Sequence, residues 1–206
     1  MKRFVIIGGA EIGNYDRIAE KINADDFIVY CDSGLKHKDK LGIEGNLIIG
    51  DFDSHEKPVT DTEIIELPVA KDDTDTVYAV KEGIKRGFDE FILLGVYGQR
   101  LDHTLCNIYA LLKLRMLGKI ATAYDDYGEF SVISNETAEI SDDFSYFSLV
   151  NISGRAKDIT ITGAKFNIEH AEIACNNQYG TSNEVLPGST AKVTVGDGTM
   201  LLIKIY

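Results

Sequence analysis

Two runs of aspartates stand where an apolar segment ends or a helix begins. Asp51-Phe52-Asp53 follows the apolar residues 47–49 after a single glycine, and Lys71-Asp72-Asp73-Thr74-Asp75 opens a helical pattern. Carboxylates at positions i and i+2 of a loop can point the same way, and a third from a neighbouring loop completes an oxygen site of the kind that holds Mg²⁺ beside nucleoside triphosphates. Helix capping is the alternative interpretation, and it explains Asp73 or Thr74 but leaves Asp-Phe-Asp unexplained. The pattern therefore predicts a magnesium site.

A third polar loop, residues 95–103, also follows an apolar run and opens a helix. Arg100 can bind two phosphate oxygens at once, and the N–H groups at a helix start attract anions. A histidine beside Arg-x-Asp suits a structural hydrogen bond as well as catalysis, so the role of His103 stays open. Gly8-Gly9 favours a tight turn, because its spacing does not match a dinucleotide fingerprint and the sequence has no Walker A motif.

The elements that must position these loops alternate in type over the first 125 or so residues. Short apolar runs predict strands over residues 4–7, 27–30, 47–49 and 91–94, and helical patterns cover residues 15–22, 75–86 and 101–117. Such alternation is typical of βαβ units, in which ligands bind at the carboxyl ends of parallel strands. We therefore expect the polar loops to meet at one edge of the sheet.

The pattern changes near residue 124, where helical periodicity disappears. Short alternating segments near residues 131–133, 146–150, 158–162, 191–195 and 200–205 predict strands, and Gly196-Asp197-Gly198 predicts a hairpin between the last two. The expected fold class is α/β, with an N-terminal mostly parallel sheet flanked by helices in residues 1–123. A C-terminal antiparallel β sandwich is expected in residues 124–206.

Composition excludes several classes of protein. The chain has 206 residues with 21 basic and 33 acidic side chains, and a net charge of −12 repels nucleic-acid backbones. Three cysteines without a C-x-x-C pair make disulfides and thiolate zinc sites poor interpretations. No apolar stretch suits a membrane span or a full signal peptide, so we expect a cytoplasmic protein with no membrane partner. His37 lies among lysines and is expected to be exposed to solvent.

Four motifs, in order and spacing, resemble the thiamine pyrophosphokinase family over nearly the whole chain. They are Gly50-Asp51-Phe52-Asp53-Ser54, Lys71-Asp72-Asp73-Thr74-Asp75, residues 95–103 with Asn107, and Gly180-Thr181-Ser182-Asn183-Glu184. The resemblance implies transfer of the terminal diphosphate of ATP, as a unit, to the hydroxyethyl group of thiamine, giving thiamine diphosphate and AMP. It also implies a homodimer in which the thiamine-binding loop meets the catalytic part of a partner subunit.

The resemblance further implies roles for individual residues. Asp51, Asp53 and Asp75 are expected to bind Mg²⁺, and with Arg100, Asp102 and His103 around the phosphates they form the expected catalytic set. Expected ATP contacts are Asp32, Ser33, Lys71, Asp72, Thr74, Arg100 and Asn107, and expected thiamine contacts are Thr181, Ser182 and Asn183. The implied domains are an ATP-binding catalytic domain over residues 1–123 and a thiamine-binding domain over residues 124–206. Gln99 and Ser33 depart from glycines that are usual in the family.

The sequence leaves open the proton acceptor of the implied reaction and two other functions, a phosphohydrolase and a vitamin sensor. Attack by an alcohol on the β-phosphorus needs in-line positioning and charge neutralisation, and Asp75, Asp102 and His103 are all candidates to accept the proton. A metal-dependent phosphohydrolase would use the same aspartates but would act on ATP without thiamine. A non-catalytic vitamin sensor would bind its ligand in the β region and leave the aspartates and Arg100 without a role.

Overall fold

The computed structural model describes residues 2–53, 57–70, 72–98 and 100–206, and it divides into two compact units. The first unit spans residues 1–126 and the second spans residues 127–206. The predicted fold class is confirmed, because the first unit has a parallel sheet with helices and the second is built from antiparallel strands. The predicted domain boundary, after residue 123, falls inside strand β6.

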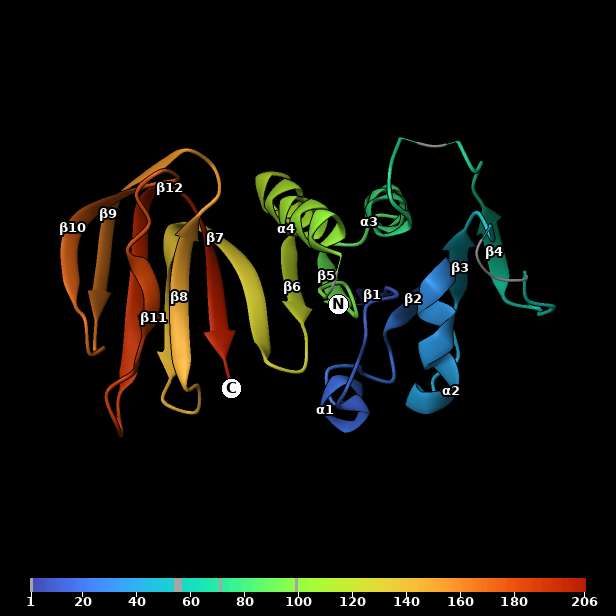
Figure 1. Cartoon of the computed structure of the whole chain (residues 1–206), viewed down its shortest axis with the longest axis horizontal. Helices are drawn as coiled ribbons and strands as arrows, with labels where there is room; N and C mark the ends of the chain where they lie inside the picture. Colours follow the sequence, from blue (N-terminus) through green and yellow to red (C-terminus); the bar gives the residue numbers. More distant parts are fainter. Residues whose placement is uncertain (1, 54–56, 71, 99) are drawn as a thin grey trace. The chain divides into compact units, whose positions relative to one another are not determined.

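Parallel strands form the sheet of the first unit, in the order β6-β5-β1-β2-β3-β4 (Figure 1). Their bounds are Arg3–Ile7 (β1), Phe27–Cys31 (β2), Leu47–Gly50 (β3), Glu63–Glu66 (β4), Glu90–Leu94 (β5) and Ile120–Tyr124 (β6). The four predicted strands are buried almost throughout, as unbroken apolar runs require when both faces of a sheet are covered. β4 and β6 escape prediction because Glu-Ile-Ile-Glu and Ile-Ala-Thr-Ala-Tyr contain too few large apolar residues to form such a run.

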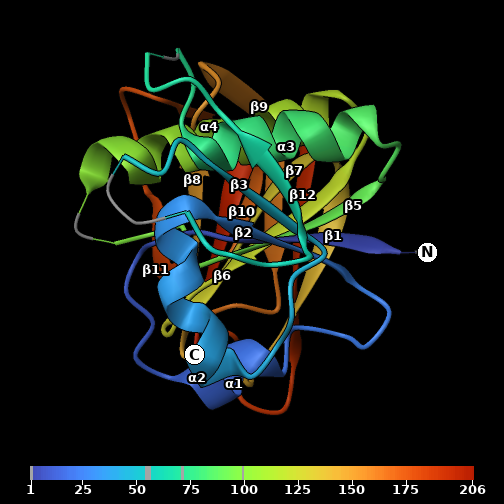
Figure 2. The same ribbon diagram turned by 90° about the vertical axis from the view of Figure 1, so that its right-hand side faces the viewer.

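Helices cover both faces of this sheet (Figure 2). α1 (Tyr15–Ala19) and α2 (Lys38–Leu41) lie on one face, and α3 (Asp75–Lys85) and α4 (Leu101–Met116) lie on the other. Alternation along β1 explains how one strand serves both layers. Val5 and Ile7 belong to the core that contains Ile18 of α1, whereas Phe4 lies against α3, where a side chain on Gly83 would come within 2.8 Å of its ring.

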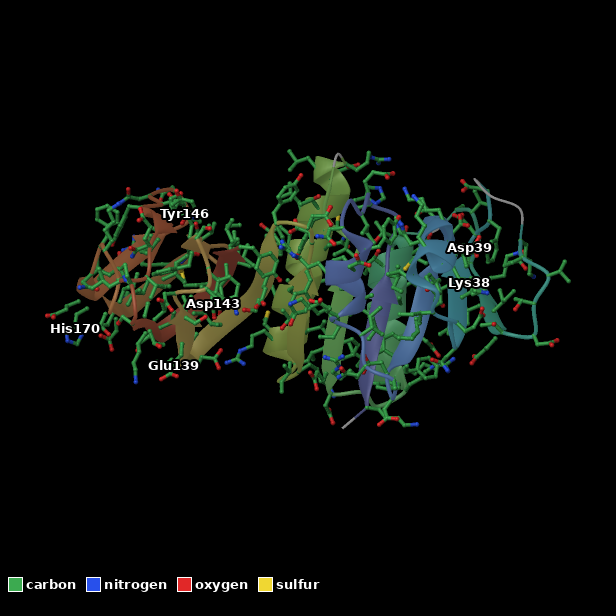
Figure 3. The ribbon with its side chains drawn as sticks, turned by 90° about the horizontal axis from the view of Figure 1, so that it is seen from below. Lys38, Asp39, Glu139, Asp143, Tyr146 and His170 are labelled. Carbon is green, nitrogen blue, oxygen red and sulfur yellow. The ribbon has the colours of Figure 1, made fainter. Side chains whose placement is uncertain are left out.

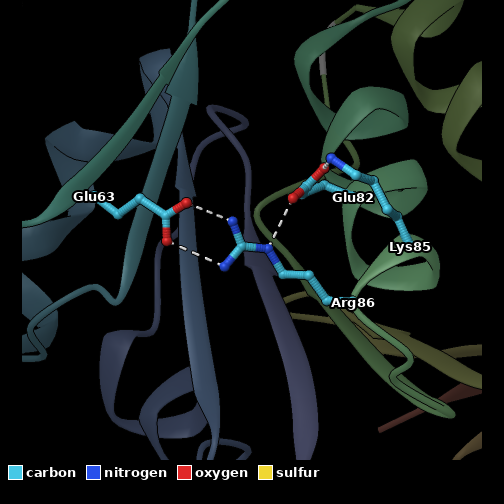
Figure 4. Close-up of polar contacts among 4 residues, drawn as sticks. All are labelled: Glu63, Glu82, Lys85 and Arg86. Atoms are coloured by element: carbon cyan, nitrogen blue, oxygen red, sulfur yellow. Dashed lines mark hydrogen bonds and ion pairs between the residues drawn. The ribbon is translucent and has the colours of Figure 1, made fainter.

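An ion-pair network ties the edge strand β4 to the end of α3 (Figure 4). The Arg86 guanidinium donates to Glu63 at 2.5 and 3.1 Å and to Glu82 at 2.8 Å, and Lys85 lies 3.3 Å from Glu82. The guanidinium lowers the pKa of Glu63, and the carboxylates raise the pKa of Arg86. Because the network is partly exposed, it specifies the position of a short strand more than it adds to stability.

A long antiparallel pair organises the second unit (Figure 1). The pair is β7 (Gly128–Ser141) with β12 (Thr190–Ile205), and the other strands are β8 (Tyr146–Asn151), β9 (Arg155–Thr162), β10 (Ile168–Ala174) and β11 (Gly180–Asn183). β9 pairs with the first half of β12 and, on its other side, with β10. β8 pairs with the second half of β12 and, on its other side, with β11. Phe147 of β8 and Ile161 of β9 share one apolar core, so the two groups of strands enclose it together.

The predicted hairpin at Gly196-Asp197-Gly198 is wrong, because the chain runs through it as the single strand β12. The pairing of β12 with β7 shifts register between Val195 and Thr199, which is the signature of a bulge. A side chain on Gly198, whose φ is 100°, would meet Ala156 at 2.8 Å. Glycine here allows two strands to approach closely, and the sequence Gly-Asp-Gly alone does not distinguish this use from a turn.

Candidate active site

Loops at the carboxyl ends of the parallel strands converge on a cavity of about 440 Å³. This volume lies in the range of small-ligand sites, and the position is where open α/β sheets bind ligands. The cavity is lined by residues 9–11, 31–33, 74–76, Asp51, Asp53, Gly95, Val96, Gly98, Arg100, His103, Thr104 and Asn107. Most of the residues that the sequence singles out in the first unit therefore lie together.

Three carboxylates form the candidate metal site. Asp32, Asp51 and Asp53 each offer an oxygen, and these oxygens all lie within 4.8 Å of one another. The close approach depends on Gly50, because a Cβ there would lie 2.4 Å from the Cβ of Asp32. Phe52, with φ of 53°, turns the chain between the two later aspartates. Closely spaced carboxylate oxygens repel one another and suit a hard divalent cation, so the donor set fits Mg²⁺.

The family resemblance implies Asp75 as the third member of this set, whereas the structure groups Asp32 with Asp51 and Asp53. Asp75 lines the same cavity from the first turn of α3. Asp32 is only 4% exposed and follows β2, the neighbour of β3 in the sheet. The sheet order would have indicated this grouping, because neighbouring parallel strands bring the loops at their carboxyl ends together.

The start of α3 shows both capping and cavity residues. Thr74 caps the helix, since its hydroxyl accepts from the Val77 N–H at 3.3 Å, and it also lines the cavity. Asp73 forms an ion pair with Lys81 along the helix, and Asp72 is exposed outside the cavity. The predicted ATP contact Lys71 lies outside the described residues.

Arg100 and Asp102 form an exposed ion pair at the start of α4. The guanidinium donates to both carboxylate oxygens, at 3.0 and 2.6 Å, and both side chains are more than 60% exposed. Asp102 raises the pKa of Arg100, and the guanidinium holds the pKa of Asp102 well below its usual range. Arg100 and His103 line the cavity, whereas Asp102 does not. Its carboxylate therefore restrains the guanidinium from outside the cavity.

Asn107 lines the cavity with a buried amide that is only half bonded. The side chain is 3% exposed, and its Nδ2 donates to the Val96 carbonyl at 2.6 Å, which fixes the orientation of the amide. Its Oδ1 is buried and has no hydrogen-bond partner within the described part of the chain. A buried acceptor of this kind is costly unless a ligand or water donates to it.

The wall formed by residues 9–11 is packed closely against its neighbours. The Ala10 N–H donates to the Gly95 carbonyl at 2.8 Å, and a side chain on Gly9 would overlap the Ser33 hydroxyl at 1.9 Å. The glycine pair thus permits contact between two loops that both line the cavity. The expectation that His37 is exposed is wrong: it is 1% exposed and bonded to the Ala10 carbonyl.

In the second unit, the predicted thiamine contacts lie on β11. Thr181 and Ser182 are exposed, and Ser182 adopts a left-handed conformation with φ of 56°. Asn183 is buried, and both ends of its amide are already used. Its Oδ1 accepts from the N–H groups of Phe166 at 3.0 Å and Glu184 at 2.9 Å, and its Nδ2 donates to the Phe166 carbonyl at 2.7 Å. The Asn183 amide therefore fixes the chain at Phe166, a residue that is 59% exposed.

Comparisons with known proteins agree with this organisation. Two family models match: the thiamin pyrophosphokinase catalytic domain over residues 18–121 and the thiamin pyrophosphokinase vitamin B1 binding domain over residues 131–200. Comparison with curated proteins gives no significant match.

Several solved structures share the fold of the chain. Thiamin pyrophosphokinase from Geobacillus thermodenitrificans is 22% identical, with a TM-score of 0.85 over 99% of this chain and 97% of that chain. The Bacillus subtilis enzyme is 21% identical, with a TM-score of 0.86 over 99% of each chain. Yeast thiamin pyrophosphokinase is 15% identical, with a TM-score of 0.76 over 100% of this chain and 86% of that chain.

Proposed function

Since the chain belongs to the thiamin pyrophosphokinase family, we propose that it makes thiamine diphosphate and AMP from thiamine and ATP in a Mg²⁺-dependent reaction. The thiamine hydroxyl oxygen forms a bond to the β-phosphorus of ATP, and the bond from that phosphorus to the oxygen shared with the α-phosphorus breaks. AMP leaves with that oxygen, and the hydroxyl proton passes to a base or to water. The observation that carries the proposal is the cavity that gathers the aspartates and Arg100 at one edge of the sheet.

Asp32, Asp51 and Asp53 are the residues that would hold Mg²⁺, because their oxygens are hard donors at close spacing. When bound, Mg²⁺ neutralises charge on the triphosphate and polarises its oxygens. Asp75 adds a further carboxylate to the same cavity. The chain's own contribution is to fix these oxygens on the ends of two neighbouring strands and a helix, where they need little rearrangement on binding.

Arg100 would stabilise charge on the phosphates. Its guanidinium is held by the Asp102 carboxylate in a fork of two hydrogen bonds, the same geometry in which arginine binds phosphate. Because this pair is exposed, exchanging the carboxylate for a phosphate costs little. The lowered pKa of Asp102 makes it a weak proton acceptor, so His103 and Asp75, which line the cavity, are better placed to take the alcohol proton.

Thiamine would be bound by the exposed hydroxyls of Thr181 and Ser182. We propose that this loop acts in a homodimer, as the family resemblance implies, and that it serves the catalytic unit of a partner subunit. Mixing Asp53→Asn protein with a Thr181→Ala/Ser182→Ala double variant tests this arrangement. Mixed dimers regain activity if the two parts come from different subunits, and they stay inactive if each chain is self-sufficient.

A coupled assay for AMP tests the function. AMP must form only when ATP, Mg²⁺ and thiamine are all present. Asp53→Asn should abolish turnover and leave the fold intact, whereas Asp61→Asn, which changes an exposed aspartate outside the cavity, should retain it. Phosphate release from ATP without thiamine would favour a phosphohydrolase instead. Absence of Mg-ATP binding by calorimetry would favour a vitamin sensor.

A further inference from the structure

His37 is a buried histidine with both ring nitrogens engaged, at the end of the 3₁₀ helix η1 (Asp32–His37) that follows β2. Its Nε2 lies 2.9 Å from the Ala10 carbonyl oxygen, and its Nδ1 lies 2.7 Å from the Tyr15 hydroxyl. The same short helix begins with Asp32 and Ser33, which line the cavity.

The partners of the ring define its protonation. A carbonyl oxygen only accepts, so Nε2 must carry the proton that it donates to Ala10. Burial lowers the pKa of His37, Lys36 and Lys40 act in the same direction, and Glu11 and the bond to Ala10 oppose them. The ring is therefore neutral near pH 7, and Nδ1 accepts from the Tyr15 hydroxyl. The Ala10 carbonyl thus selects this tautomer, and the hydrogen bond from Tyr15 stabilises it.

The Ala10 carbonyl belongs to the cavity wall, residues 9–11. This wall is tied down at three successive points. Ala10 donates to Gly95 at 2.8 Å, its carbonyl accepts from His37, and Glu11 pairs with Lys36 at 2.6 Å. Of these three contacts, the hydrogen bond from buried His37 joins the wall to η1, the helix that also carries Asp32.

We propose that neutral His37 is a positioning residue for the nucleotide pocket, holding the wall of residues 9–11 through Ala10, and that a hydrogen bond from the Tyr15 hydroxyl stabilises the tautomer that the Ala10 carbonyl requires. The inference rests on the proposed function, because it takes this cavity to bind Mg-ATP. Displacing the wall relative to Asp32 weakens Mg-ATP binding without touching the thiamine loop, and small displacements of a pocket have large effects on reacting groups.

Substrate kinetics test the proposal with three variants. His37→Leu removes both hydrogen bonds, Tyr15→Phe removes only the hydroxyl, and His37→Gln keeps an N–H near the position of Nε2. We expect His37→Leu to raise KM for Mg-ATP by about tenfold and to leave KM for thiamine within about twofold. Tyr15→Phe should have a smaller effect in the same direction, and His37→Gln should restore most of the loss. His170→Gln, at an exposed histidine of the second unit, is the matched control.

Two further measurements keep the test decisive. Long-range ¹H–¹⁵N correlation spectra of the wild-type protein at pH 7 should show a neutral His37 with the proton on Nε2, and a proton on Nδ1 would overturn the proposal even if the leucine variant fails to fold. Equal losses for both substrates in folded His37→Leu, or normal Mg-ATP affinity in it, would also overturn it. If the wild-type protein forms no thiamine-dependent AMP, the proposed function is wrong. The spectra would still show which nitrogen of His37 carries the proton.

Discussion

The two units of the molecule use their buried asparagines differently. In the β unit, Asn183 and Asn151 have both ends of their amides bonded to backbone groups, Asn151 to the Ser153 N–H at 3.0 Å and the Ile173 carbonyl at 2.8 Å. In the α/β unit, Asn107 lines the cavity and uses its Nδ2 alone, and no group in the described part of the chain donates to its buried Oδ1. A fully bonded buried amide holds the scaffold together, whereas a half-bonded one at a cavity is ready for a ligand.

The histidines show the same contrast. His37 of the α/β unit is buried, neutral and fixed by two partners. His170 of the β unit points outward from β10 (Figure 3) and pairs with Asp158, which raises its pKa. The buried histidine of the α/β unit thus contacts the cavity wall, whereas the exposed histidine of the β unit forms a surface ion pair.

The largest effect should come from the carboxylate group. Asp32→Asn keeps the size of the side chain but removes one of the three charges near the cation, so we expect kcat to fall at least about a hundredfold, as for Asp53→Asn. Asp61→Asn serves as the control. Steady-state AMP formation at saturating ATP measures the effect. If Asp32→Asn retains normal turnover while Asp75→Asn does not, the metal set predicted from sequence is right and the grouping seen in the structure is not the functional one.

The next effect concerns stability in the β unit. Asn183→Ala leaves the N–H groups of Phe166 and Glu184 and the Phe166 carbonyl without partners, so we expect the free energy of unfolding to fall by about 2 to 3 kcal/mol. Denaturant titration measures the loss, with exposed Thr181→Ala as the control. A fully stable Asn183→Ala protein with impaired thiamine binding would assign the residue to the ligand, as the resemblance implies, and would remove the contrast with Asn107.

Asn107→Ala should show the reverse balance. It loses one hydrogen bond, to Val96, and one acceptor that nothing in the described chain uses, so stability should fall by only about 1 kcal/mol. We expect the affinity of a substrate that donates to Oδ1 to drop about tenfold. Separate KM values for Mg-ATP and thiamine identify that substrate. The comparison fails if Asn151→Ala, the matched variant of the β unit, changes the same KM.

The sequence predicts the features of the fold that depend on neighbouring residues, and it fails where contacts between distant segments decide. Apolar runs predict β1, β2, β3 and β5, and helical patterns predict α3 and α4, because each of these signals lies within one continuous segment of the chain. The sequence does not group Asp32 with Asp51 and Asp53, because only the pairing of β2 with β3 brings it to Asp51. His37 was misjudged because its lysine neighbours suggest a solvated face, while its burial depends on Tyr15 and Ala10, which are distant in sequence. Gly-Asp-Gly in β12 suits a bulge as well as a turn, and the long pairing with β7 decides between them.

The smallest effect is a pH dependence of opposite sign for the two histidines. Because the pKa of His37 is lowered from its ordinary value of 6.5, the unfolded chain takes up a proton that the folded protein does not, so its stabilisation is complete above pH 6.5 and is lost as the pH falls. For His170 the pKa is raised, so its stabilisation is present below pH 6.5 and is lost as the pH rises through the raised pKa. The difference in unfolding free energy between wild type and His37→Gln should therefore shrink by at most about 1 kcal/mol from pH 6.5 to 5.5, while the difference from His170→Gln grows on the same descent. Denaturant titrations of the three proteins at several pH values measure both trends, and equal signs for the two variants would contradict the assignment of a buried neutral ring in one unit and an exposed charged ring in the other.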